Sequence, residues 1–262
     1  MYKSIKFCSN YMLPNTLFMG QQLLFIAACA STNSEAQQLL IKNEATEGCT
    51  VITHKQTQGR GQRGNSWEAE PGQNITLSVI LSPSFLAVRR QFYLNMAVSL
   101  AVLDLLREQG MQKAQVKWPN DLFFEDKKLG GILIENTINS HTLQHSIVGI
   151  GLNVNQLRFS SPAATSMANV SRRAFDLEKV TMRLLELLEK RYLQLRNGQT
   201  DRLKVEYLQG LYRYQEVHAF KIGDQEVQGQ ILGVNEEGRL AVKIGNELRY
   251  FDFKEIAHVI NC

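Results

Sequence analysis

The residues from Gly59 to Trp67 are the first in the chain whose types could bind a reacting anion. The segment reads Gly-Arg-Gly-Gln-Arg-Gly-Asn-Ser-Trp, which sets Arg60 and Arg63 among glycines. Glycines let backbone N–H groups crowd around an anion, and guanidinium groups add charge-assisted hydrogen bonds to phosphate or carboxylate oxygens. The segment matches neither a Walker loop nor a dinucleotide fingerprint. It predicts an anion-binding loop, with a solvated surface loop as the alternative.

The segment Lys117–Asp121 could hold a cation near such an anion. It reads Lys-Trp-Pro-Asn-Asp, in which Pro119 favours extended geometry before it and Asn120 and Asp121 can turn the chain. A carboxylate and an amide oxygen suit Mg²⁺, which takes one or two protein ligands together with substrate phosphates. Asp121 is therefore a candidate metal ligand, and the alternative is a solvated turn.

Two later segments place glycines inside apolar strands. The first, Lys128–Glu135, reads Lys-Leu-Gly-Gly-Ile-Leu-Ile-Glu, and the second, Gly149–Asn155, alternates small and apolar residues at its start. Glycines in a strand mark a bulge or a place where a ligand approaches the backbone closely. Lys128 could reach into that space. The alternatives are a surface lysine in a charged turn and an ordinary packed strand.

Strands and helices of ordinary length can bring these segments together. Thr32-Asn33-Ser34-Glu35 has the spacing of a capping box, and Gly110 stands where the cap of a long helix belongs. Periodicity predicts strands at 23–28, 51–53, 75–81 and 146–154, extended chain over 116–135 that turns at 125–128, and helices at 32–42, 89–109, 177–195 and 201–212.

The chain changes character after residue 212. Short β-like runs at 217–221, 226–234, 239–244 and 247–253 alternate with turn dipeptides. This pattern predicts a small antiparallel barrel. We therefore expect an N-terminal arm over 1–20, a catalytic domain over 21–212 and a barrel domain over 213–262.

Composition narrows the class of protein. The 262 residues are 44% hydrophobic and 21% charged, which is ordinary for a folded chain, and the net charge of +4 suits an anionic substrate without requiring nucleic acid. The apolar run Leu23–Ala30 is too short to span a bilayer. Cys8, Cys29, Cys49 and Cys262 form no C-x-x-C pair, so a reducing cytoplasm is expected.

Taken together, these segments resemble the ordered motif set of the biotin–protein ligases. The resemblance covers about residues 20–262 and rests on Ser31–Asn33, Gln56, Gly59–Trp67, Lys117–Asp121, Lys128–Gly131 and Gly149–Asn153. It implies an α+β fold with a mixed central β-sheet flanked by helices, similar to class II aminoacyl-tRNA synthetases and lipoate ligases. It also implies a small C-terminal SH3-like β-barrel.

The resemblance implies a two-step reaction. ATP activates biotin to biotinyl-5′-AMP with Mg²⁺ as cofactor, and the biotinyl group then passes to a specific lysine of a biotin carboxyl carrier protein or domain. No helix-turn-helix pattern precedes the catalytic region, so we expect an enzyme that binds neither DNA nor membrane. A homodimer remains open.

Residue by residue, the resemblance assigns roles to the motif positions. Lys128, Arg60 and Arg63 are the expected catalytic residues, with Lys128 neutralising the biotin carboxylate and the developing phosphate charge. The residues expected to bind biotin are Ser31, Thr32, Asn33, Gln56, Arg60, Gly61, Gln62, Lys128, Gly131, Gly149 and Gly151. Those expected to bind ATP are Arg63, Trp67, Lys117, Asn120 and Asn153. Asp121 is the expected metal ligand.

The chain departs from the family pattern at Gln62, where the loop usually carries a second arginine, and at Ala30, where aspartate is frequent. Arg63 is the expected compensator for Gln62. Two rival hypotheses remain. A lipoate–protein ligase shares the fold and the adenylation logic, and a noncatalytic module that binds polynucleotides would show salt-sensitive binding without ATP–pyrophosphate exchange.

Overall fold

A mixed sheet of seven strands forms the centre of the molecule, a computed structural model that describes residues 12–259. The strand order is β1-β2-β3-β7-β6-β5-β4; β1 and β2 are parallel, and the other neighbours are antiparallel. The predicted mixed sheet is therefore confirmed. The strands are β1 (Leu23–Cys29), β2 (Thr50–Gln56), β3 (Ile75–Leu81), β4 (Ala114–Lys117), β5 (Asp121–Phe124), β6 (Lys127–Asn139) and β7 (Thr142–Leu152).

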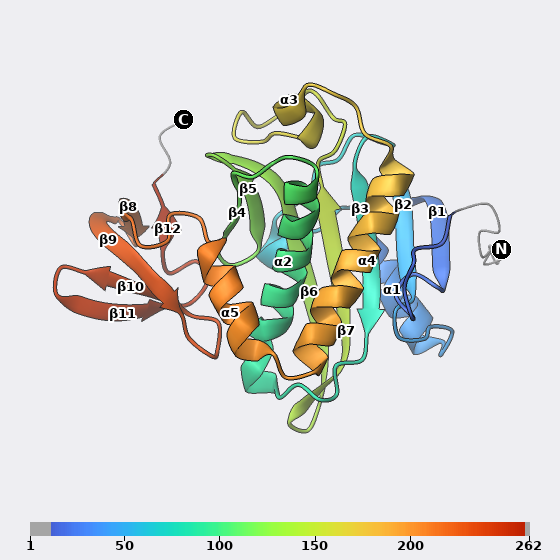
Figure 1. Cartoon of the computed structure of the whole chain (residues 1–262), viewed down its shortest axis with the longest axis horizontal. Coiled ribbons are helices and arrows are strands. Elements are labelled where there is room, and N and C mark those ends of the chain that lie inside the picture. The colour runs from blue at the N-terminus through green and yellow to red at the C-terminus, as the bar shows by residue number, and fades with distance from the viewer. Residues whose placement is uncertain (1–11, 260–262) are drawn as a thin grey trace.

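Helices cover both faces of this sheet. Along β3, Leu77 and Val79 join the main core while Ile80 joins a smaller cluster under α1, as the two-residue period of a strand requires. Figure 1 shows α2 and α4 crossing the sheet on one side and α1 lying on the other. The helices are α1 (Thr32–Ile41), α2 (Phe92–Glu108), the short and unpredicted α3 (Met167–Ser171), α4 (Leu177–Arg196) and α5 (Thr200–Gln209).

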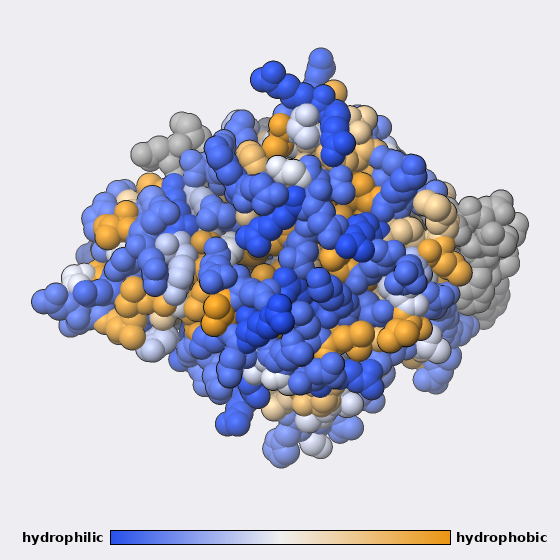
Figure 2. All heavy atoms as spheres, in the orientation of Figure 1, coloured by the Kyte–Doolittle hydropathy of each residue, from blue (hydrophilic) through white to orange (hydrophobic). Residues whose placement is uncertain are grey.

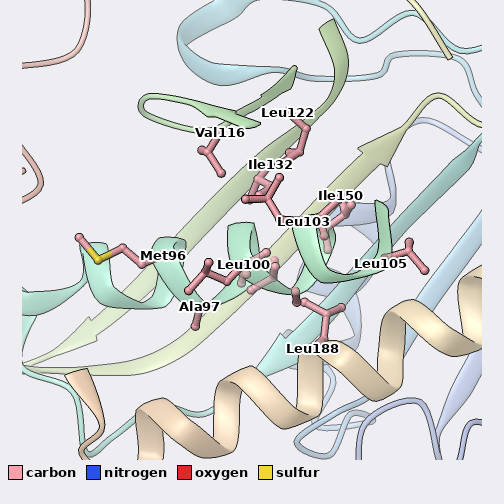
Figure 3. Packing of buried hydrophobic residues seen from close by; sticks show 14 of the residues in the cluster. Met96, Ala97, Leu100, Leu103, Leu105, Val116, Leu122, Ile132, Ile150 and Leu188 are labelled. Atoms are coloured by element: carbon pink, nitrogen blue, oxygen red, sulfur yellow. The ribbon is translucent and has the colours of Figure 1, made fainter. Parts of the chain in front are cut away.

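The main core lies between α2, α4 and the sheet. Figure 3 shows Leu100 and Leu103 of α2 pointing toward Ile132 and Ile150 on the strands, with Leu188 of α4 beside them. All of these side chains are buried. This close packing fixes the strands from one face of the sheet. Residues elsewhere on β2, β6 and β7 are therefore held in place firmly enough to build a site.

The start of α1 differs from the predicted capping box. Ser31 is the N-cap, and no side chain caps the helix. The hydroxyl of Thr32 instead donates to Gln56 Oε1 at 3.2 Å. The polar side chains at this helix start bond across to neighbouring strands, so they are unavailable to the first helical turn.

A second sheet follows the last helix. Its strand order is β11-β10-β9-β8-β12, with every described pair antiparallel. The predicted strands are confirmed, but the expected closed barrel is not, because no ladder within residues 12–259 joins β11 to β12. The strands are β8 (Val217–Ile222), β9 (Gln225–Val234), β10 (Leu240–Ile244), β11 (Glu247–Phe251) and the unpredicted β12 (Ala257–His258).

This C-terminal sheet is fastened to the end of the central sheet near β4. The Trp118 indole donates to the carbonyl of Gly238 at 2.9 Å, and the backbone N–H of Tyr212 donates to the carbonyl of Val116 at 2.8 Å. A Cβ at Gly238 would collide with the Phe92 ring. Figure 1 shows the C-terminal sheet beside β4 and β5, so its inner edge can contribute to a site there.

The beginning of the described chain lies along α4. Buried Glu189 accepts hydrogen bonds from the backbone N–H groups of Leu17, Phe18 and Met19 at 2.8, 2.9 and 3.0 Å. Of the predicted arm, residues 1–11 lie outside the described part. Figure 2 shows that the helical face of the molecule is mainly hydrophilic, with scattered apolar residues. No helix within residues 12–259 has the length and apolar character to cross a bilayer.

Candidate active site

A cavity of about 260 Å³ opens where the loop after β2, the turn between β4 and β5, and the C-terminal sheet meet. Strands β6 and β7 form its floor, where Gly131 pairs with Gly151. Apolar side chains and a set of polar and basic groups share the wall. The predicted residues that line it are Ser31, Thr32, Asn33, Gln56, Arg60, Gly61, Gln62, Trp67, Lys117, Asn120, Asp121, Lys128, Gly131, Gly149 and Gly151.

A cluster of side chains that are hydrogen-bonded to one another forms one end of the cavity. Gln56 Oε1 accepts from the backbone N–H of Thr32 at 2.8 Å. Buried Ser78 places its hydroxyl 2.7 Å from Thr32 Oγ1 and 2.5 Å from Asn33 Oδ1. Gly149 leaves room for this arrangement, because a Cβ there would approach Asn33 Oδ1 far inside 3.0 Å. Donors and acceptors are thus presented together at a largely buried wall.

The middle of the cavity carries excess positive charge. Lys128 Nζ lies 2.6 Å from Asp121 Oδ1, and both side chains are partly exposed to the cavity, at 37% and 26%. The basic lining residues are Arg60, Lys117, Lys128 and Lys254, whereas Asp121 is the one carboxylate among the described lining residues. Such an imbalance suits a ligand with several negative charges.

Lys117 responds to this crowding of positive charge. Burial lowers the pKa of its ammonium group, Asp121 opposes that shift, and Lys128 and Arg213 add to it. Its Nζ lies 4.7 Å from the centre of the Phe123 ring. An anionic ligand beside Lys117 would favour the protonated form that burial disfavours.

The predicted anion-binding loop folds over the cavity as a small hairpin. The backbone N–H of Gly61 donates to Asn65 at 2.7 Å, and that of Trp67 donates to Gly59 at 3.0 Å. The Trp67 ring lies against Gly151, where a Cβ would collide with it, and its indole nitrogen is buried without a hydrogen-bond partner. The loop therefore brings an aromatic face and a spare donor to the wall.

The predicted residue Asn153 is not among the residues that line the cavity. Asn153 is buried behind it, where its amide nitrogen donates to the carbonyl of Thr165 at 3.0 Å and its Oδ1 has no hydrogen-bond partner. The chain beyond β7 turns toward α3, which draws Asn153 away from the cavity. Arg63 belongs to the short 3₁₀ turn Gln62–Gly64, and its predicted role stays a prediction.

Several lining residues were missed from the sequence because they come from the C-terminal sheet and its connections. They are hydrophobic or aromatic apart from Lys254 and His258, and no local motif marks them. The set is Phe220, Leu240, Phe253, Lys254, Ile256, Ala257 and His258. They lie on the same side as Lys117, so the cavity is completed by a part of the chain far away in sequence.

His258 packs against the rings of Tyr212 and Phe220, with centroids 5.3 and 4.9 Å away. Burial lowers its pKa to about 3, with smaller contributions from the nearby charges of Lys117, Arg213 and His218. Neither ring nitrogen has a hydrogen-bond partner. The imidazole is therefore neutral in the folded protein at any pH near neutrality.

This neutrality predicts a loss of stability in weak acid. Below the ordinary histidine pKa, His258 binds a proton in the unfolded chain but not in the folded protein. Its contribution to the free energy of unfolding is therefore fully present above about pH 6.5 and is lost as the pH falls toward the folded pKa. From pH 6.5 to 5.0 we expect His258 to contribute a loss of roughly 2 kcal/mol. Urea titrations over this range would measure the loss.

His258→Phe should remove this part of the dependence of the free energy of unfolding on pH. His141→Asn, at an exposed position, should retain it. The same pH dependence in the parent protein and both variants would contradict the assignment.

The chain is similar to known ligases in sequence. A profile of the Biotin/lipoate A/B protein ligase family matches residues 25–153. The biotin–acetyl-CoA-carboxylase ligase of Mycobacterium tuberculosis is 30% identical over 244 residues, 91% of this chain and 90% of that protein. The bifunctional ligase/repressor BirA of Bacillus spizizenii is 30% identical over 241 residues, 87% of this chain and 71% of that protein.

The fold is also similar to that of a solved biotin protein ligase. The biotin protein ligase of Aquifex aeolicus, solved in complex with biotin and ATP, aligns with a TM-score of 0.75 at 22% identity. The alignment covers 90% of this chain and 98% of that one. The sequence similarity, the fold and the gathering of the motif residues around one cavity all point to the same family. The chain belongs to the biotin/lipoate A/B protein ligase family, among its biotin–protein ligases.

Proposed function

We propose that this protein is an ATP-dependent biotin–protein ligase that works in the cavity described above. The observation that carries the proposal is the gathering of the polar cluster, the cationic centre and the tryptophan-bearing loop around one space. Biotin has a polar ureido ring at one end and a carboxylate at the other, and ATP brings a triphosphate and a purine. The cavity offers a complementary group for each of these parts.

In the first step, a carboxylate oxygen of biotin attacks the α-phosphorus of ATP. The bond from that phosphorus to the bridging oxygen of the β-phosphate breaks, and pyrophosphate leaves with the bonding electrons. In the second step, a neutral lysine amine of the carrier attacks the acyl carbon, the bond from that carbon to the phosphate oxygen breaks, AMP leaves with the bonding electrons, and the nitrogen releases a proton to the solvent. Both steps bring anions together or develop charge on oxygen, so fixed positive groups such as Lys128 would lower their barriers.

The polar cluster favours biotin over lipoate. A ureido group has two N–H donors and one carbonyl acceptor, and Thr32, Asn33 and Gln56 supply matching groups that are already oriented by hydrogen bonds. The dithiolane ring of lipoate has no N–H or carbonyl group with which to bond them. A hydrogen bond that a ligand fails to make with a buried polar group costs on the order of 1–3 kcal/mol, which is enough for strong discrimination.

The nucleotide would lie toward Lys117 and the C-terminal sheet. The Trp67 indole nitrogen, which lies at the wall and is buried without a hydrogen-bond partner, would be a donor available to the nucleotide. Mg²⁺ fits here as an ion carried by ATP, because the described residues contain no cluster of three or more metal-binding side chains. Asp121 would supply one oxygen to that ion, which is enough when phosphates provide others.

Asp121→Asn should raise the Mg²⁺ concentration required for half-maximal exchange by about threefold to tenfold, because one negative ligand is lost from the shell of a hard cation. The substitution also weakens the hold on Lys128, so the maximal rate should fall as well. A Mg²⁺ titration at saturating ATP and biotin separates the two effects. Glu125→Gln is the control in the neighbouring turn; an unchanged Mg²⁺ requirement in Asp121→Asn would remove Asp121 from the metal site.

Biotin-dependent exchange of labelled pyrophosphate into ATP tests the proposal directly, because it reports the first step without any carrier. We expect exchange with biotin and none above background with lipoate. Exchange with lipoate alone would reverse the substrate assignment. Absence of exchange with either, together with salt-sensitive polynucleotide binding, would support the noncatalytic alternative.

The proposal extends to the acceptor and the domain plan. The acceptor is a lysine of a biotin carboxyl carrier protein or domain, modified in the cytoplasm. The catalytic domain is assigned to residues 21–212 and the second domain to 213–262, whose sheet is proposed to be an open variant of an SH3-like barrel. The wall residues from that sheet support a role for this domain in completing the nucleotide side of the site.

A further inference from the structure

Glu135 on β6 joins two parts of the cavity that no sequence motif connects. Its Oε2 accepts from Asn33 Nδ2 at 2.7 Å and from Arg60 Nη2 at 3.1 Å. Asn33 belongs to the polar cluster at the start of α1, and Arg60 belongs to the loop over the cavity. One carboxylate oxygen therefore holds a group from each of the two segments.

In the described part of the chain, the backbone hydrogen bonds of the loop do not reach β6. Its base is fixed by bonds from Thr57 and Gln58 to the end of β1 and the residue after it, but Gly61 and Trp67 bond within the loop itself. A groove of about 460 Å³ separates the loop from β6, with Arg60, Leu133 and Glu135 in its wall. The Arg60–Glu135 ion pair crosses this groove.

Asn33 depends on Glu135 in a different way. Its Oδ1 faces the Ser78 hydroxyl, and its Nδ2 has a short bond to Glu135 and a longer one of 3.4 Å to the carbonyl of Leu133. Two partners of opposite type fix which way the amide points, because only the NH₂ group can donate to a carboxylate. A neutral acceptor in place of Glu135 could preserve this orientation but not the ion pair with Arg60.

We propose that Glu135 is a positioning residue with two separable effects: through Arg60 it keeps the loop closed over the activated intermediate, and through Asn33 it orients the binding site for the ring system of biotin. This inference rests on the proposed function. It assigns the carboxylate to retention of the adenylate and its acceptor oxygen to recognition of biotin.

Two substitutions separate the effects. Glu135→Gln keeps an acceptor oxygen for Asn33 and loses the ion pair, so biotinyl-adenylate should escape about threefold to fivefold faster while the KM for biotin changes by less than about twofold. Glu135→Ala loses both contacts, so escape should rise as in Glu135→Gln, and the KM for biotin should rise about tenfold because a buried donor loses its better partner.

The escape rate is measured on the whole 262-residue chain without carrier. Enzyme loaded with labelled biotin and ATP is mixed with excess unlabelled biotinyl-adenylate, and the label remaining bound is followed with time. Exchange kinetics at varied biotin give the KM. Glu108→Gln is a matched control, because the Arg183–Glu108 pair is exposed to nearly the same degree, 45% and 40%, as Arg60–Glu135, 44% and 40%, and lies outside the cavity.

A double-mutant cycle tests whether Glu135 acts through Arg60. Arg60→Ala alone should speed escape, and adding Glu135→Gln to it should have no further effect. Equal escape rates for Glu135→Gln and the parent, with normal exchange in both, would overturn the inference and leave the proposed function standing. A fully additive double mutant would do the same. A parent protein that shows no biotin-dependent exchange would instead overturn both.

Discussion

Lys128→Ala is expected to slow biotin-dependent ATP–pyrophosphate exchange by about 100-fold to 1,000-fold while the protein stays folded, the scale typical of removing a group that stabilises developing charge. Lys128 Nζ faces the cavity beside Asp121 and lies 5.9 Å from the centre of the Trp67 ring. Asp121, with which Lys128 forms an ion pair, is the one carboxylate among the described lining residues. Without this ammonium, the repulsion between the biotin carboxylate and the α-phosphate would be compensated less well as the two groups approach each other.

The preceding residue provides the control. Lys127 is exposed at the start of β6, so Lys127→Ala changes the same net charge one position away without touching the cavity. Its exchange rate should match that of the parent protein. If Lys128→Ala retained exchange within about threefold of the parent, Lys128 would be a surface lysine and the charge-neutralisation role would be wrong.

Gly149→Ala is expected to raise the KM for biotin by about 10-fold to 100-fold, because displacing Asn33 breaks one or two buried hydrogen bonds. The new methyl group would overlap Asn33 Oδ1 and push the amide away from Ser78 and Glu135. The KM for ATP should change little. Exchange kinetics with each substrate varied in turn would measure both constants.

Gly151→Ala on the same strand is the matched comparison. The resemblance assigns Gly151 to biotin, but the methyl group of the alanine would meet the Trp67 indole instead of Asn33. We therefore expect the KM for ATP to rise and the KM for biotin to be nearly preserved. Both glycines lie in β7, and thermal unfolding would show whether either alanine disturbs the sheet itself. If the two variants changed the same constant, the division of the cavity into a biotin end and a nucleotide end would be wrong.

Many of the residues that line the cavity were predictable as site candidates from local pattern. The predicted chemistry rests on residue types at short spacing in the loop at Gly59–Trp67, in the turn at Lys117–Asp121 and at the strand glycines. Such short spacing does not depend on how the rest of the chain folds. Of the predicted site residues, those named above as lining one cavity came from segments far apart in sequence. Helix and strand positions followed from periodicity, since burying one face requires it.

Tertiary structure alone decided the partners and the outer wall. Glu135 reads in the sequence as the polar end of an apolar strand, yet pairing of β6 with β7 and the docking of α1 bring it to both Asn33 and Arg60. Lys254 and His258 enter the wall because the Trp118 and Tyr212 bonds fasten the C-terminal sheet to β4. Asn153 sits in a motif but turns away, since its amide satisfies the backbone near α3. Motif spacing sets which groups exist, whereas their directions and neighbours depend on long-range packing and hydrogen bonding that no local pattern encodes.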